Sequence, residues 1–293
     1  MKELQLFNEA YFIYIAFFLV FILGSITIFK NKSEEFKKRY IASLLFFSLI
    51  VHFCKLLFPP YVNDEFAIRK ITPENICALS TLIFPFIFLS QNKVLKDYMF
   101  YVGILSGTLA VFFPLEAIGK VAFSFDAIRF YVCHTIITVA PFLMVYAGLH
   151  KLNYRRIYKV PICFLIVYVI ILVNEIILIE IGLVPLRSGN LFATGDEFYR
   201  NFSMVFGVSE NFEAMEGIIS FFTPEFMMRI PFGPHAGEKK YWPVLWAIFP
   251  AFVYIGGLSL LLSIYWEKAH MKADFLNIKN YVKRYFVRRT KIN

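Results

Sequence analysis

Residues 10–29 read AYFIYIAFFLVFILGSITIF, a run of twenty residues without one charged side chain. A helix rises about 1.5 Å per residue, so this run would span about 30 Å, the thickness of the hydrocarbon core of a bilayer. It lacks a small-residue cleavage site, and a basic stretch from Lys30 to Arg39 follows it. We therefore expect a transmembrane helix that is retained in the protein, not a signal peptide.

Comparable apolar segments recur along the chain of 293 residues. They predict helices at about 10–29, 40–58, 74–91, 94–113, 129–150, 158–183 and 242–266. With 59% apolar and only 17% charged residues, the chain has too little polar surface to coat a soluble globule. The sequence predicts an all-α polytopic membrane protein: a seven-transmembrane-helix bundle over residues 1–266, with a long outer loop at 184–241 and a basic tail at 267–293. A soluble enzyme and a secreted disulfide scaffold are excluded.

Basic residues gather in alternate loops. One set of loops, together with the tail, holds nineteen of the thirty Lys and Arg residues. Because cytoplasmic loops are enriched in Lys and Arg, we expect a multi-pass protein of the cell membrane with its N-terminus outside and its C-terminus in the cytoplasm. Aromatic residues interrupt the basic tail, which predicts anionic lipid headgroups as its partner. No nucleic-acid motif accompanies the charge, so no nucleic acid is expected as a partner.

All the cysteines fall inside apolar segments, which favours free thiols within the membrane over a disulfide framework. They are Cys54, Cys77, Cys133 and Cys163. The chain also lacks a nucleotide-binding glycine loop, a metal-ligand spacing and a G-x-S-x-G motif. Neither a cofactor nor a metal site is expected.

Polar residues within the predicted spans converge on the outer ends of four helices. They are His52, Asn75, Cys77, His134, Asn174 and Glu175. Taken singly, such residues more often pack small side chains or hydrogen-bond between helices than perform chemistry, and the Gly103–Gly107 spacing indicates close helix packing. Packing alone does not explain why four helices place polar groups at one level. We expect His52, Asn75, Asn174 and Glu175 to border one substrate-binding cavity.

A thiol becomes a nucleophile when a base lies beside it, and His134 could be that base for Cys77. The helix rise places both residues roughly 6–8 Å below the outer boundary. We therefore expect the sulfur and the imidazole to lie within roughly 3–6 Å, in direct or one-water contact. Such a pair could attack an acyl ester, form a thioester and pass the acyl group to water or to a lipid hydroxyl.

Residues 74–114 read ENICALSTLIFPFIFLSQNKVLKDYMFYVGILSGTLAVFFP, and VHF at 51–53, RFYVCHTIITVAPF at 129–142 and YWPVLW at 241–246 accompany them. In their order these motifs resemble the YwaF-like bacterial membrane proteins and their eukaryotic relative, transmembrane protein 164. The resemblance implies a seven-helix bundle and a cysteine acyltransferase acting on phospholipids. By this resemblance, Cys77 corresponds to the family cysteine and His134 to the histidine of the fifth helix. His52 and Asn174 would then be supporting polar groups.

The outer loop at 184–241 is rich in phenylalanine with acidic residues between. This composition predicts an amphipathic segment in the outer interface, either a lid over the site or a docked surface loop.

Two other classes of function stay open. Carboxylates and histidines within spans are typical of proton or cation relays, which predicts a transporter that uses residues such as Glu74, Glu175, Glu180, His52 and His134. A non-catalytic membrane scaffold is the third possibility. The first reading is a cysteine-dependent lipid acyltransferase or acyl hydrolase of the outer leaflet, with membrane lipids as its partners.

Overall fold

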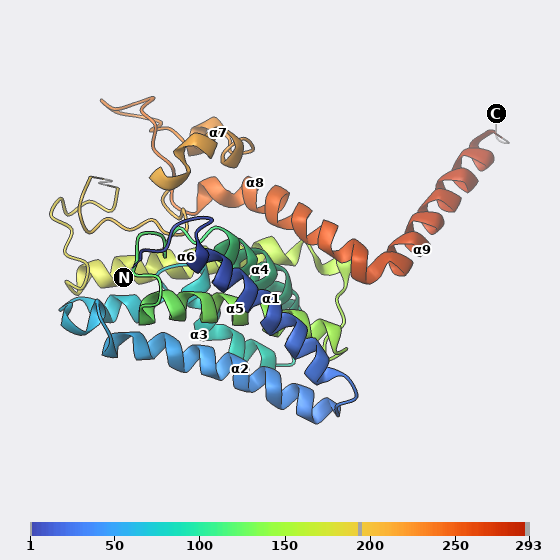
Figure 1. Cartoon of the computed structure of the whole chain (residues 1–293). Helices are drawn as coiled ribbons and strands as arrows, with labels where there is room; N and C mark the ends of the chain where they lie inside the picture. Colours follow the sequence, from blue (N-terminus) through green and yellow to red (C-terminus); the bar gives the residue numbers. More distant parts are fainter. Residues whose placement is uncertain (1, 193–194, 291–293) are drawn as a thin grey trace.

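The computed structural model describes residues 2–192 and 195–290. Within them the chain is helical, with two isolated β-bridges and no strand. The long helices are α1 (Glu9–Phe29), α2 (Glu34–Cys54), α3 (Ile76–Leu89), α4 (Lys93–Phe112), α5 (Phe125–Tyr146), α6 (Lys159–Glu180) and α9 (Gly256–Thr290). The predicted all-α bundle is confirmed (Figure 1).

Six described segments have the length and hydropathy of membrane spans, and the helix of the third predicted span is shorter. That helix, α3, has 14 residues. It is short because the chain before it turns inward: residues 55–75 form the 3₁₀ helices η1 (Lys55–Leu57), η2 (Tyr61–Asn63) and η3 (Ala67–Ile71). Lys55 and Asn75, at the two ends of this connector, are buried. Therefore α3 starts inside the bundle and not at its surface.

Helix α5 is the central helix, with most of its length buried against α1, α2, α3 and α4 (Figure 1). Its closest neighbour is α4, and glycines permit the approach. A Cβ atom on Gly103 would lie 2.8 Å from the Ile137 carbonyl oxygen, and one on Gly107 would lie 2.9 Å from the His134 carbonyl oxygen. The close packing predicted from the Gly103–Gly107 spacing is confirmed.

The bundle has two ends, named here for what they carry. The Cys77 end is the end where α3 begins and α4 stops, and it includes the loop 113–124. The basic end includes the loops 30–33, 90–92 and 147–158. Antiparallel succession from α1 to α6 follows from these short connections.

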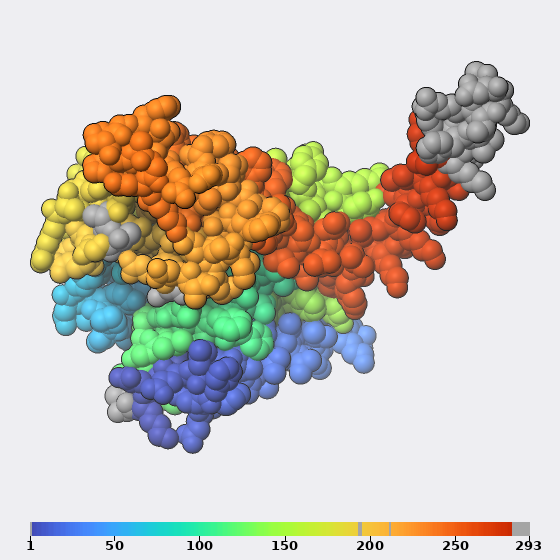
Figure 2. Space-filling model, turned by 90° about the horizontal axis from the view of Figure 1, so that it is seen from above, coloured from blue at the N-terminus to red at the C-terminus, as the bar shows by residue number. Residues whose placement is uncertain are grey.

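The loop 184–241 folds into short turns: η5 (Glu210–Met215), α7 (Glu216–Ile219) and η6 (Glu225–Met227). Figure 2 shows it gathered at one end of the molecule, away from the projecting part of α9. Its first half is anchored, because Trp246 Nε1 donates to the Met204 carbonyl at 3.0 Å. Its second half leaves phenylalanines exposed: Phe221, Phe226 and Phe232. Residues 193 and 194 of the predicted loop lie outside the described residues.

The last span begins with η7 (Leu245–Ala247), α8 (Ile248–Pro250) and the π-turn η8 (Ala251–Ile255), and continues into α9. A non-helical φ of −123° at Glu267 bends α9. Glu267 is the first residue of the predicted basic tail, which here is helical up to Thr290 (Figure 1). The last three residues of that tail, including Lys291, lie outside the described residues.

Candidate functional site at the start of α3

The start of α3 is held by its own N-cap and by side chains from two other parts of the chain. Asn75 is the N-cap, and its Oδ1 accepts the Ala78 N–H at 2.7 Å. Its Nδ2 donates to Glu116 Oε1 at 3.2 Å, and the Ile76 N–H donates to Ser203 Oγ at 2.9 Å. An N-cap satisfies backbone N–H groups that the first turn leaves without partners. This arrangement fixes the turn that carries Cys77.

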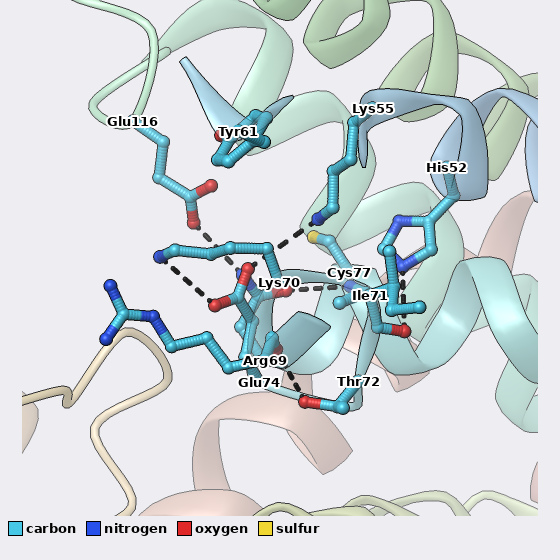
Figure 3. Close-up of polar contacts among 12 residues, drawn as sticks. His52, Lys55, Tyr61, Arg69, Lys70, Ile71, Thr72, Glu74, Cys77 and Glu116 are labelled. Carbon is cyan, nitrogen blue, oxygen red and sulfur yellow. Dashed lines mark hydrogen bonds and ion pairs between the residues drawn. The ribbon is translucent and has the colours of Figure 1, made fainter. Parts of the chain in front are cut away.

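Two side chains hold the connector before α3, and Figure 3 shows the contact of the first, His52, with Ile71. His52 of α2 lies 3.2 Å from the Ile71 carbonyl oxygen through Nε2, so this nitrogen carries the proton and donates. Asn174 of α6 donates through Nδ2 to Thr72 Oγ1 at 3.1 Å, and Thr72 in turn donates to the Arg69 carbonyl at 2.6 Å. Both His52 and Asn174 therefore position residues 71–72.

Glu74 lies at the centre of a buried ion cluster. Its carboxylate is 3.9 Å from Lys55 Nζ and 3.4 Å from Lys70 Nζ, as Figure 3 shows, and 3.5 Å from Arg200 Nη2. Arg200 Nε lies 2.6 Å from Glu175 Oε1, and both side chains are about as buried as the protein core, at 6% and 5% exposed. The pair is close but off the hydrogen-bond direction, so it acts as an ion pair. A charge buried this deeply is tolerated only when paired.

Glu116, in the loop between α4 and α5, adds a further carboxylate beside Asn75. Glu116 as a whole residue is exposed, but its carboxylate turns toward the site, where it accepts from Asn75 (Figure 3). Desolvation of that inner end, with the Glu74 charge nearby, raises the pKa of Glu116. Its carboxyl can therefore take up a proton more readily than a carboxyl in water.

Cys77 is half-buried in the first turn of α3, and Ser106 of α4 and Glu116 lie close enough to act on its sulfur. His134 is buried in α5, where Nδ1 is 2.6 Å from the Phe130 carbonyl oxygen and donates to it. The lone pair of a neutral ring is then on Nε2, the nitrogen that can act as a base.

The levels of Cys77 and His134 can be compared through α4. Ser106 lies beside the sulfur of Cys77, and the next residue, Gly107, lies against the carbonyl of His134. Successive residues of one helix differ by about 1.5 Å in height, so the two partners share a level of the bundle. In the described part of the chain no hydrogen bond joins the thiol to the imidazole, and the expected separation of 3–6 Å stays a prediction.

The other expected site residues, His52, Asn75, Asn174 and Glu175, all lie at the Cys77 end, and each bonds to protein groups. Sequence reasoning missed three charged members of the site: Lys70, Glu116 and Arg200. Lys70 and Glu116 lie in connectors outside the apolar segments. Arg200 lies in the loop 184–241, where no spacing distinguishes it from Arg187 or Arg229.

Several apolar helices around a buried set of ionisable groups define a multi-pass integral membrane protein with a polar site near one end of its bundle. The chain belongs to the TMEM164 family, which it matches over residues 5–208. The matched part holds α1 to α6 and the site through Ser203, and it ends before η5 and α9. Neither the curated proteins nor the solved structures contain a match.

Proposed function

We propose that this membrane protein transfers acyl groups of membrane lipids through Cys77. The observation that carries the proposal is the convergence of four separate segments on residues 71–76, the turn that delivers Cys77. His52 of α2, Asn174 of α6, Glu116 of the loop 113–124 and Ser203 of the loop 184–241 each hold one point of this turn. A nucleophile must be held within a fraction of an ångström of its productive position, and such support supplies that precision.

In the proposed reaction, the Cys77 S–H proton moves to a base while sulfur attacks the carbonyl carbon of a lipid ester. The ester C–O bond then breaks, and the departing alkoxide takes the proton back from the base. The product is a thioester on Cys77. In the second half, a lipid hydroxyl or water gives its proton to the same base and attacks the thioester carbon, and the C–S bond breaks to restore the thiol.

Two groups are candidates for the base. His134 has its Nε2 lone pair available because Nδ1 donates to Phe130. Glu116 is near the sulfur and has a raised pKa. Replacement of the true base should lower kcat by about 10²- to 10⁴-fold, the usual contribution of general-base catalysis, with little change in KM. Kinetics of His134→Asn and Glu116→Gln, measured side by side, decide between them.

The direct test uses purified protein in nanodiscs and a panel of phospholipids with isotopically labelled acyl chains. The readouts are labelled fatty acid, newly acylated lipid and hydroxylamine-sensitive label on the protein. Cys77→Ala should abolish all three, while the matched control Cys163→Ala, also half-buried but in α6, should leave them unchanged. Equal turnover by wild type and Cys77→Ala would rule out the mechanism.

A second candidate function, ion or proton transport, is favoured by the cluster of Lys55, Glu74, Glu175 and Arg200. Flux into proteoliposomes discriminates it from acyl transfer. A transporter would lose flux in Glu175→Gln and keep it in Cys77→Ala, whereas the acyltransferase shows no flux in either.

The proposed orientation places the basic end in the cytoplasm and the Cys77 end in the outer leaflet, because Lys and Arg concentrate at the basic end. The C-terminal helix is then proposed to contact anionic headgroups of the inner leaflet. An epitope at the C-terminus of intact spheroplasts should resist added protease, and cleavage of the epitope there would reverse the assignment.

A further inference from the structure

A cavity that is open to the surface on one side lies at the basic end, at the opposite end of the bundle from Cys77. It is a cavity of about 680 Å³ between the first turn of α4, the loop 148–156 and the bend of α9. Binding sites for small molecules commonly occupy about 300–1,000 Å³. The space is therefore large enough for a headgroup or a small metabolite, and none of its residues takes part in the proposed acyl transfer.

One wall of the cavity rests on a buried triad of ionisable side chains. Asp97 of α4 is 2% exposed in its side chain, and it lies 2.7 Å from His150 Nε2 and 2.6 Å from Arg156 Nε. Arg156 also donates to the Lys151 carbonyl at 3.3 Å. Because Asp97 fixes both His150 and Arg156, the loop 148–156 is held in one shape at the cavity wall.

The opposite wall is α9, and the loop 148–156 contacts α9 at the bend of this helix. Arg155 Nη2 lies 2.6 Å from Asp274 Oδ1, and the Tyr154 hydroxyl donates to the same carboxylate. The Tyr154 N–H donates to Glu267, the residue at which α9 bends. These contacts close the cavity on the side of α9.

The charges that line the cavity do not balance. Arg155 is paired with Asp274, and Arg156 is paired with Asp97 behind the wall. Three lining lysines have no carboxylate within 4.0 Å in the described part of the chain: Lys93, Lys96 and Lys151. Against them stands the remaining lining carboxylate, Glu267. The cavity therefore has an excess of positive charge, to which the N-terminus of the 20-residue α4 helix adds.

We propose that this cavity binds a phosphate group, and that the lysines of α4 and of the loop 148–156 are its ligands. Lysine ammonium groups are strongly hydrated point charges and pair well with phosphate oxygens. Two sources could supply the group: the headgroup of an anionic phospholipid, or a soluble phosphate ester. The fixed triad and the bound α9 keep the lysines facing one space, which distinguishes the cavity from diffuse surface charge.

The test uses the full-length protein in two settings. In detergent, isothermal titration calorimetry measures the affinity for inorganic phosphate and for glycerol 3-phosphate, which represent a soluble ligand. In nanodiscs of phosphatidylcholine with and without phosphatidic acid, native mass spectrometry counts retained lipids and measures the lipid source. The variant is Lys96→Gln with Lys151→Gln. Its control is Lys30→Gln with Lys37→Gln, which removes the same charge at the same end of the bundle but outside the cavity.

The cavity variant should bind about thirtyfold more weakly, fivefold to sixfold for each lysine removed, and the control should bind like wild type. Saturable binding of phosphate or of glycerol 3-phosphate assigns a soluble ligand, and retention of phosphatidic acid alone assigns a lipid headgroup. Both results support the site. Equal loss in the two double variants would show diffuse surface charge and overturn the proposal, as would the absence of saturable binding in both settings. Because Cys77 chemistry is measured separately, either idea can fail alone.

Discussion

Replacing Arg200 by methionine should destabilise the protein strongly, because it removes the cation from a buried ion pair and keeps the anion. The Arg200 Nε to Glu175 Oε1 distance is 2.6 Å, which gives a gross attraction of about 6 kcal/mol at an effective dielectric constant of 20. Glu74 would keep Lys55 and Lys70, whereas Glu175 would be left buried without a partner. The free energy of unfolding should fall by about 3–5 kcal/mol, the usual result of breaking a buried pair.

Unfolding in mixed micelles of rising SDS mole fraction, followed by tryptophan fluorescence, measures this change. The double variant Arg200→Met with Glu175→Met removes both charges and should recover most of the loss, because apolar replacement of a whole pair is often neutral. Arg187→Met is the matched control: its partner Glu197 is at the surface, and such pairs contribute about 0–1 kcal/mol. A loss below about 1 kcal/mol in Arg200→Met, or a double variant weaker than the single, would refute the reasoning.

The remaining predictions concern charge, packing and capping. The pKa of Glu116 is raised in the folded state, so its contribution to stability is full below the unfolded-state pKa and is lost as pH rises through the folded-state pKa. In unfolding experiments at a series of pH values, wild type should lose more stability with rising pH than Glu116→Gln. Parallel curves for the two proteins would contradict this. Gly107→Ala should lower the free energy of unfolding by about 1–3 kcal/mol, because the new methyl group would collide with the backbone of α5. In Gly24→Ala of α1 the methyl group meets nothing within 4 Å, so this control should be neutral or slightly stabilising. Thermal unfolding measures both variants. Asn75→Ala should cost about 0.5–2 kcal/mol of stability and lower acyl transfer with it, and full activity in this variant would separate the cap from the chemistry.

The membrane-spanning segments could be predicted from the sequence because a span must be continuous and apolar. The ends of the helices could not, because caps and charged pairs determine them. Hydropathy predicts the second helix from residue 40, whereas α2 begins at Glu34, six residues earlier. Ser33 caps it, and Glu34 and Glu35 pair with Lys38 and Arg39 one turn later. A segment predicted from hydropathy ends where charged residues begin. The helix itself includes these charged residues, because its N-cap and its i,i+4 ion pairs stabilise the first turns.

Site residues could be predicted from the sequence only where they lie within the apolar segments. Cys77, His134, His52 and Asn174 stood out because a polar group in an apolar segment is costly. Arg200 did not, since its role depends on the loop folding back onto α6, a contact that no local pattern encodes. Pairing across such distances in sequence is decided by tertiary packing.

The bend at Glu267 turns the end of α9 into a lever. From Glu267 to Thr290 the helix extends about 35 Å, at 1.5 Å per residue. A change of 10° at the bend would sweep the far end through about 6 Å, although the atoms around Tyr154 and Asp274 need move only a fraction of that distance. A distance label at Asn280 would therefore report rearrangements of the loop 148–156 that are too small to resolve at the loop itself.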